Sequence, residues 1–239
     1  MREKLIVALD VKSFDEAKRI VDILYPHVKI FKVGSKLFTS CGPEIIKAIH
    51  KKGGEVFLDL KFHDIPNTVS GSVESAAQLG VFMLTVHTLG GSLMLKEAAE
   101  SAMRSARKFN TRKVKIVGVT VLTSMDNKDL RGVGISRDLK KEVISLAKLA
   151  KKQGLDGIVA SAAEAKHIRK VTGKNFIIIT PGIRPSGAAK DDQKRIVTPK
   201  DAIRNGASYI VVGRPIIEAK NPRAATIGIL KEIEDAKKK

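Results

Sequence analysis

Residues 55–69, Glu55-Val-Phe-Leu-Asp-Leu-Lys-Phe-His-Asp-Ile-Pro-Asn-Thr-Val69, join a short β-prone run to the start of a helix. Pro66 suits the first position of that helix, because its missing N–H would have no partner there. Side chains two apart in a strand share a face, so Asp59 and Lys61 point the same way and their apolar neighbours point the other way. Asp64 follows where the strand ends. The stretch predicts a strand-to-helix unit that carries two carboxylates and an ammonium at the carboxyl end of its strand.

This charge trio is set among apolar residues rather than in a polar stretch. Burying charges is costly unless they pair or take part in chemistry. We therefore favour a functional site over a simple ion pair, which stays as the alternative.

Strand-like and helix-like segments alternate along the whole chain. The expected strands are Leu5–Asp10, Val28–Val33, Glu55–Lys61, Phe82–His87, Val114–Val119, Gly157–Ala160, Phe176–Thr180 and Tyr209–Val212. The expected helices are 14–24, 36–51, 67–79, 92–107, 138–153, 163–171, 199–205 and 222–236. Eight such units over this length predict an α/β fold, a single-domain (β/α)8 TIM barrel over residues 1–239. A doubly wound open sheet is the alternative.

Composition narrows the class of protein. The chain has 239 residues, one cysteine (Cys41), and no apolar run near the roughly 20 residues of a membrane helix. The N-terminus enters a strand at once, so we expect no signal peptide, no membrane association and a cytoplasmic location. The net charge is +19, but the lysines are spread along the chain, aromatic content is 4% and tryptophan is absent. Base-stacking platforms are therefore poorly supplied, and nucleic-acid binding is disfavoured.

Polar residues fall at the ends of nearly every expected strand, where a barrel places its active site. They include Asp10, Lys32, Asp59 and Lys61. The glycine- and proline-rich segment at about 181–197 is long enough to be a lid loop. Gly213 and Arg214 follow the eighth strand, where such barrels bind phosphate. His87 and His63 are assigned no catalytic role.

The motifs resemble those of the orotidine 5′-phosphate decarboxylase family, in its compact bacterial type, over the whole chain. The matching motifs are Val7-Ala-Leu-Asp10, Phe31-Lys-Val-Gly34, Asp59-Leu-Lys-Phe-His-Asp-Ile-Pro-Asn-Thr68, Thr85-Val-His87, Thr180-Pro-Gly-Ile-Arg184, Asp192-Gln-Lys-Arg195 and Val212-Gly-Arg-Pro215. The Asp-x-Lys-x-x-Asp core is shared with related sugar-phosphate enzymes, so the flanking residues carry the specificity of the match.

The resemblance implies conversion of orotidine 5′-phosphate to uridine 5′-phosphate (UMP) and CO2, the last step of de novo pyrimidine synthesis, with no metal and no cofactor. It implies catalytic roles for Lys61, Asp59, Asp64 and Lys32. It implies substrate contacts from Asp10, Lys32, Asp59, Thr68, Thr123, Arg184, Gln193, Gly213 and Arg214. It also implies a homodimer in which Asp64 and Thr68 reach the neighbouring subunit's site.

A Mg²⁺-dependent sugar-phosphate decarboxylase or aldolase of the same barrel group is the alternative function. Such a relative would be expected to have an acid in place of Lys32, so that residue argues against it.

Overall fold

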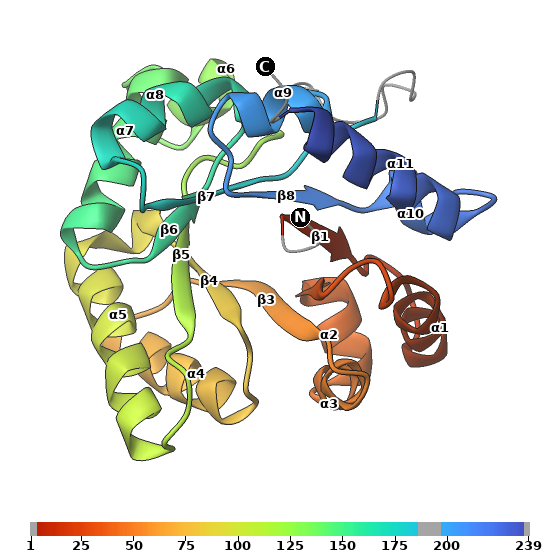
Figure 1. Ribbon diagram of the computed structural model, residues 1–239. Helices are drawn as coiled ribbons and strands as arrows, with labels where there is room; N and C mark the ends of the chain where they lie inside the picture. The colour runs from red at the N-terminus through yellow and green to blue at the C-terminus, as the bar shows by residue number, and fades with distance from the viewer. Residues whose placement is uncertain (1–3, 186–196, 237–239) are drawn as a thin grey trace.

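The computed structural model describes residues 4–185 and 197–236 (Figure 1). Eight parallel strands form a closed barrel in sequence order, and β1 pairs with both β2 and β8. The strands are β1 (Leu5–Ala8), β2 (Ile30–Gly34), β3 (Glu55–Phe62), β4 (Met83–His87), β5 (Lys115–Val119), β6 (Gly157–Val159), β7 (Ile177–Thr180) and β8 (Tyr209–Val212). The predicted (β/α)8 barrel is confirmed, and the open sheet is excluded.

Helices cover the outside of the barrel (Figure 1). They are α1 (Phe14–Leu24), α2 (Ser35–Cys41), α3 (Glu44–Lys51), α4 (Pro66–Gln78), α5 (Gly91–Lys108), α6 (Asn127–Gly132), α7 (Leu139–Lys152), α8 (Ala162–Thr172), α9 (Pro199–Arg204), α10 (Arg214–Ile217) and α11 (Pro222–Asp235), with a 3₁₀ turn η1 (Thr88–Gly90). Most of the predicted helices match to within one residue at each end.

The expectation of one helix over 36–51 is wrong. The structure splits this segment into α2 and α3 at Gly42 and Pro43. Gly42 has a φ of +58°, in the left-handed region that ends helices, and Pro43 has no N–H to continue the ladder. The short helices α6 and α10 were not predicted from the sequence.

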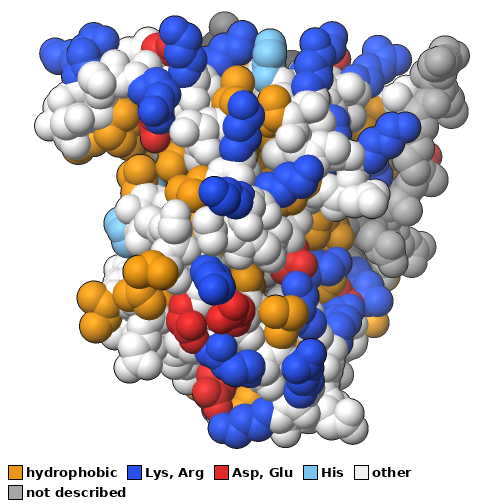
Figure 2. All heavy atoms as spheres, turned by 90° about the vertical axis from the view of Figure 1, so that its left-hand side faces the viewer, with side chains coloured by type: hydrophobic (Ala, Val, Ile, Leu, Met, Phe, Trp, Pro, Cys, Tyr) orange, Lys and Arg blue, Asp and Glu red, His pale blue; other side chains and the backbone are white. Residues whose placement is uncertain are grey.

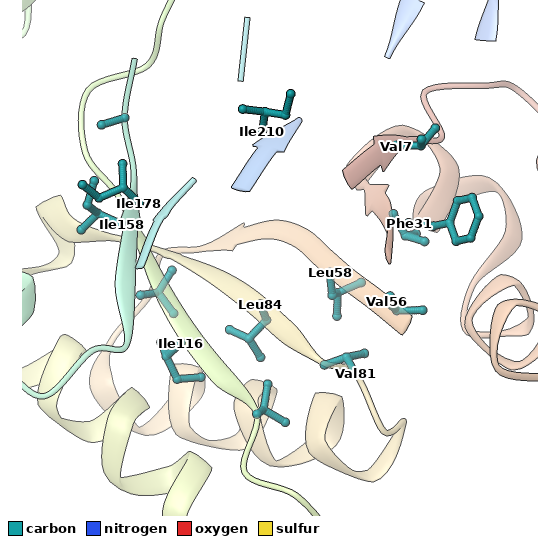
Figure 3. Close-up of a cluster of buried hydrophobic side chains, with 14 of the residues drawn as sticks. Val7, Phe31, Val56, Leu58, Val81, Leu84, Ile116, Ile158, Ile178 and Ile210 are labelled. Atoms are coloured by element: carbon teal, nitrogen blue, oxygen red, sulfur yellow. The ribbon is translucent and has the colours of Figure 1, made fainter. Parts of the chain in front are cut away.

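Strand alternation separates an inner core from an outer core. Side chains of Ile6, Ala8, Ile30 and Phe57 belong to the cluster inside the barrel. Their sequence neighbours point outward, and Val7, Leu58 and Ile116 are among the buried residues of the larger cluster beneath the helices (Figure 3). The inner row of β1 and of β2 therefore leads to Asp10 and Lys32 at the carboxyl ends, as the predicted parity requires.

Lysine and arginine side chains are dispersed over the face shown in Figure 2, with acidic side chains among them. Within the two described ranges, every helix is too short or too polar to cross a bilayer.

Candidate active site

A cavity of about 560 Å³ opens at the carboxyl ends of the strands. Its apolar lining includes Ala8, Phe57, Ile179 and Val211, which are also members of the inner core. Its polar lining includes eight of the predicted site residues: Asp10, Lys32, Asp59, Lys61, Thr123, Arg184, Gly213 and Arg214. The barrel therefore gathers residues that are far apart in the sequence around one space above the inner core.

Four charged side chains, three from β2 and β3 and one from just after β1, alternate in sign along one side of this cavity. Lys32 Nζ lies 3.0 Å from Asp10 Oδ1 and 3.6 Å from Asp59 Oδ2. Lys61 Nζ lies 3.0 Å from the same Asp59 oxygen. The Asp59 and Lys32 side chains are only 13% and 11% exposed, whereas Lys61 is 39% exposed. Asp59 thus links two ammonium groups, and Lys61 is the one that remains open to the cavity.

Two features of the backbone shape this network: the absence of a side chain at Gly34 and the positive φ of Lys61. A Cβ atom on Gly34 would lie 3.0 Å from Lys32 Nζ, so a side chain there would force the ammonium to move. Lys61 has a φ of +53°. This left-handed conformation is unfavourable for any residue that has a Cβ atom. Strain of this kind persists only where the surroundings over-determine it, and it concentrates at functional sites.

A buried threonine of β4 contacts both members of the Asp59–Lys61 pair. Thr85 Oγ1 accepts a hydrogen bond from the Lys61 backbone N–H at 2.8 Å and donates one to Asp59 Oδ1 at 3.0 Å. The sequence motif includes Thr85, but no signal in the sequence marks its hydroxyl as part of the site.

Two arginines line the cavity from the loops after β7 and β8. Arg184 is 5% exposed, and Arg214 begins α10 directly after Gly213. A Cβ atom on Gly213 would lie 3.4 Å from Ala8 Cβ and 3.6 Å from Asp10 Oδ2, so this glycine lies in van der Waals contact with the end of β1 and the region that follows it. Two guanidinium groups at the loops after the last two strands suit a phosphate, because each can fork two of its oxygens.

Two further charged residues line the cavity that sequence reasoning missed. Lys36 of α2 donates from Nζ to the Asp10 carbonyl at 3.4 Å, and Glu218 follows α10. Neither lies at the end of an expected strand, and neither belongs to one of the matching motifs.

Among the predicted site residues that the structure describes, two lie outside this cavity. Asp64 and Thr68 are exposed and outside its lining, and Asp64 Oδ1 accepts a hydrogen bond from the backbone N–H of Ile65 at 2.6 Å. Gln193 and most of the expected lid at 181–197 lie outside the described residues. No group of three or more His, Cys, Asp or Glu side chains suited to a metal ion occurs in the described ranges.

Two histidines stack beside the site. The rings of His63 and His87 have centroids 5.3 Å apart and an interplanar angle of 20°. Burial, with smaller contributions from His63 and Lys61, lowers the pKa of His87 below its ordinary value of 6.5. His87 is partly buried, and the sequence left its role open between a structural and a catalytic one.

A closed parallel barrel with a charged cavity at the carboxyl ends of its strands places this chain among the (β/α)8-barrel enzymes. Residues 3–228 match the model of the orotidine 5′-phosphate decarboxylase / HUMPS family. The chain belongs to this family.

Individual relatives narrow the similarity to the decarboxylase branch. The chain is 47% identical to the orotidine 5′-phosphate decarboxylase of Geotalea daltonii over 232 residues, which are 97% of this chain and 96% of the relative. It is 47% identical to that of Moorella thermoacetica over 237 residues, which are 99% and 94% of the two chains. The crystal structure of orotidine 5′-phosphate decarboxylase from Lactobacillus acidophilus superposes with a TM-score of 0.85 at 40% identity, covering 97% of this chain and 99% of that one.

Proposed function

We propose that this enzyme decarboxylates orotidine 5′-phosphate to UMP and CO2, with Lys61 as the group that stabilises the reacting carbon and then protonates it. The observation that carries the proposal is the Lys32–Asp59–Lys61 network beside a cavity that also holds two arginines. The names of the relatives, at 47% identity over nearly the whole chain, point to the same substrate.

The chemistry requires a fixed positive charge. Loss of CO2 from C6 of the pyrimidine leaves an electron pair in an sp² orbital that no neighbouring π-system accepts. A preorganised cation aimed at that orbital, in a site that excludes water, stabilises the developing charge. The Lys61 ammonium then transfers a proton to C6, which gives UMP and a neutral amine that solvent reprotonates.

Asp59 has the geometry to aim that cation. One of its oxygens accepts a hydrogen bond from Lys61 Nζ at 3.0 Å, which holds the ammonium in one direction. Asp59 also lies where it can crowd the substrate carboxylate, an effect that we rank second because the role of like-charge destabilisation is contested.

The substrate contacts follow the layout of the cavity. Asp10 and Lys32 are proposed to hold ribose hydroxyls, and Thr123 the edge of the pyrimidine. Arg184, Gly213 and Arg214 are proposed to bind the phosphate. The role of Gln193 between base and phosphate, and that of the lid, stay predictions from the resemblance.

We propose that Asp64 and Thr68 complete the site of a second copy of the chain. Both are exposed and outside the cavity of their own chain. Large apolar side chains are exposed in the same region, with Ile65 at 66%, Leu89 at 45% and Leu93 at 74%. An apolar surface next to the two unused polar residues fits a homodimer interface.

The dimer proposal is tested by mixing two inactive variants, Lys61→Ala and Asp64→Ala. If Asp64 acts across the interface, mixed dimers hold one intact site, and random reassortment restores about a quarter of wild-type activity. A mixture that stays inactive although reassortment is shown by mass, or a monomer in sedimentation, contradicts shared sites.

The reaction is tested by the loss of orotidine 5′-phosphate absorbance in the presence of EDTA. We expect turnover by the wild type and by Lys115→Ala, a control that removes a strand lysine outside the cavity, and almost none by folded Lys61→Ala. Turnover only when Mg²⁺ is restored, or only on a sugar phosphate, would establish the alternative function instead.

A further inference from the structure

Thr85 lies fully buried in β4, behind the Asp59–Lys61 pair and outside the cavity lining. We propose that Thr85 is a positioning residue whose single hydroxyl fixes both the carboxylate of Asp59 and the backbone of Lys61. This inference deepens the proposed function and rests on it, because it assigns to Thr85 an effect on the rate through those two residues.

The hydrogen-bonding capacity of the hydroxyl leaves one arrangement. The Lys61 backbone N–H can only donate, so Thr85 Oγ1 is the acceptor in the 2.8 Å contact. The one hydroxyl proton is then free for Asp59 Oδ1, 3.0 Å away. An ionised carboxylate only accepts, so this polarity also matches the charge that Asp59 carries beside two ammonium groups.

The two oxygens of the Asp59 carboxylate therefore have different partners. Oδ1 is held by Thr85, and Oδ2 faces Lys61 Nζ at 3.0 Å and Lys32 Nζ at 3.6 Å. A carboxylate held at one oxygen cannot rotate freely, so the direction of the Lys61 ammonium is set from the buried side of the site.

Strand pairing shows why a side chain is needed at this point. Between the pairs Leu58–Leu84 and Phe62–Val86, residues 59–61 of β3 lie opposite Thr85 alone in β4. The irregularity includes Lys61 at φ +53°. The hydroxyl of Thr85 accepts a hydrogen bond from the Lys61 N–H at the point where the register of the ladder shifts. It therefore supports the strained backbone conformation that directs Lys61 into the cavity.

The test compares Thr85→Val, which keeps the shape and removes the hydroxyl, with Thr85→Ser, which keeps the hydroxyl. Thr226→Val is the matched control, since Thr226 is equally buried and its hydroxyl donates only to the carbonyl of Pro222 in α11. Thermal unfolding of all variants reports the cost of losing a buried hydroxyl.

We expect kcat of Thr85→Val to fall about 10- to 100-fold, the loss of a hydrogen bond to a charged group, with KM changed by no more than about threefold. Thr85→Ser restores most of kcat, and Thr226→Val matches the wild type. A Thr85→Val enzyme as fast as Thr226→Val, or a folded Thr85→Ser enzyme as slow as Thr85→Val, would overturn the inference.

Crystal structures of the wild type and Thr85→Val make the inference independent of turnover. We expect the Asp59 carboxylate to rotate and Lys61 to leave the left-handed region in the variant. Unchanged positions of both residues would overturn the role of Thr85 even if the wild type decarboxylated nothing, an outcome that would separately remove the proposed function.

Discussion

Replacing Lys61 by glycine and by alanine separates its chemistry from its backbone. Both variants lose the ammonium and its 3.0 Å contact with Asp59, so both lose activity. They differ in the backbone. At φ +53°, alanine keeps the penalty of a left-handed residue, about 1–2 kcal/mol, and glycine does not. Glycine loses roughly 0.5–1 kcal/mol through its greater freedom in the unfolded chain. We therefore expect Lys61→Gly to be about 0.5–1 kcal/mol more stable than Lys61→Ala.

The same pair of substitutions at Lys115 gives the reference. Lys115 lies in β5 without a positive φ, so glycine there is expected to be about 0.5–1 kcal/mol less stable than alanine. The difference between the two sites, about 1–2 kcal/mol, is the backbone strain held at Lys61. Urea unfolding at one protein concentration measures all four variants, and fixing the concentration keeps any dimerisation term constant.

The reasoning is refuted if the glycine variant is less stable than the alanine variant at both Lys61 and Lys115. If Lys61→Gly were less stable than Lys61→Ala by as much as at Lys115, Lys61 would hold no strain, and the argument that its surroundings over-determine its conformation would fail.

Three further expectations follow from the site and the core. Arg214→Ala removes a forked contact proposed for the phosphate and should lower kcat/KM by about 3–5 kcal/mol, or roughly 10²- to 10⁴-fold, in steady-state kinetics. Phe57→Ala leaves a cavity at the top of the inner core, where Phe57 is 2% exposed, and should cost about 3–5 kcal/mol in urea unfolding. The pKa of His87 is lowered in the folded state, so below about pH 6.5 the unfolded chain binds more protons at this residue and acid destabilises the fold. His87→Asn should therefore flatten the loss of stability between about pH 7 and pH 5.

Each of these has a plain contrary outcome. An unchanged kcat/KM for Arg214→Ala would contradict the proposed contact between Arg214 and the phosphate. A Phe57→Ala variant no less stable than Phe57→Leu would mean that the site collapses around the missing ring. If His87→Asn and the wild type lost stability in parallel on acidification, the proton uptake would belong to another group, such as His50, whose pKa is also lowered by burial.

The sequence predicted which charged residues of the first three strands line the cavity, because the alternation of side chains along a strand is a local rule. Ile6, Ala8 and Asp10 are two apart, and so are Phe57, Asp59 and Lys61. Once a segment is known to be a strand, its inner row leads to the cavity without knowledge of the other strands. Arg214 was predicted from its place in the loop after the eighth strand, whereas Arg184 was assigned only through the family resemblance.

What the sequence did not predict depends on contacts between segments. The left-handed conformation of Lys61 arises from a register shift against β4, and the hydroxyl of Thr85 matters only because it lies opposite that shift. The cavity position of Lys36 depends on how the interrupted helix is placed over β2 and β1. The exposure of Asp64 beside apolar side chains is likewise a property of the folded surface rather than of the motif.

The two ends of the cavity have to act together, because one lysine is not enough. The slowest uncatalysed reactions require barrier reductions on the order of 20 kcal/mol, whereas removing a single preorganised donor costs an enzyme about 3–4 kcal/mol. The remainder must come from binding energy that is realised in the transition state, including that of parts of the substrate remote from C6. Lys32, Asp59 and Lys61 lie in β2 and β3, and Asp10 follows β1. The arginines follow β7 and β8, and β8 pairs with both β7 and β1 in the closed barrel. If the arginines bind the phosphate as proposed, the closed sheet holds them at a set distance from Lys61, and we expect phosphate binding to align C6 with the ammonium. On this argument Arg214→Ala lowers kcat as well as raising KM, which distinguishes alignment from simple attachment.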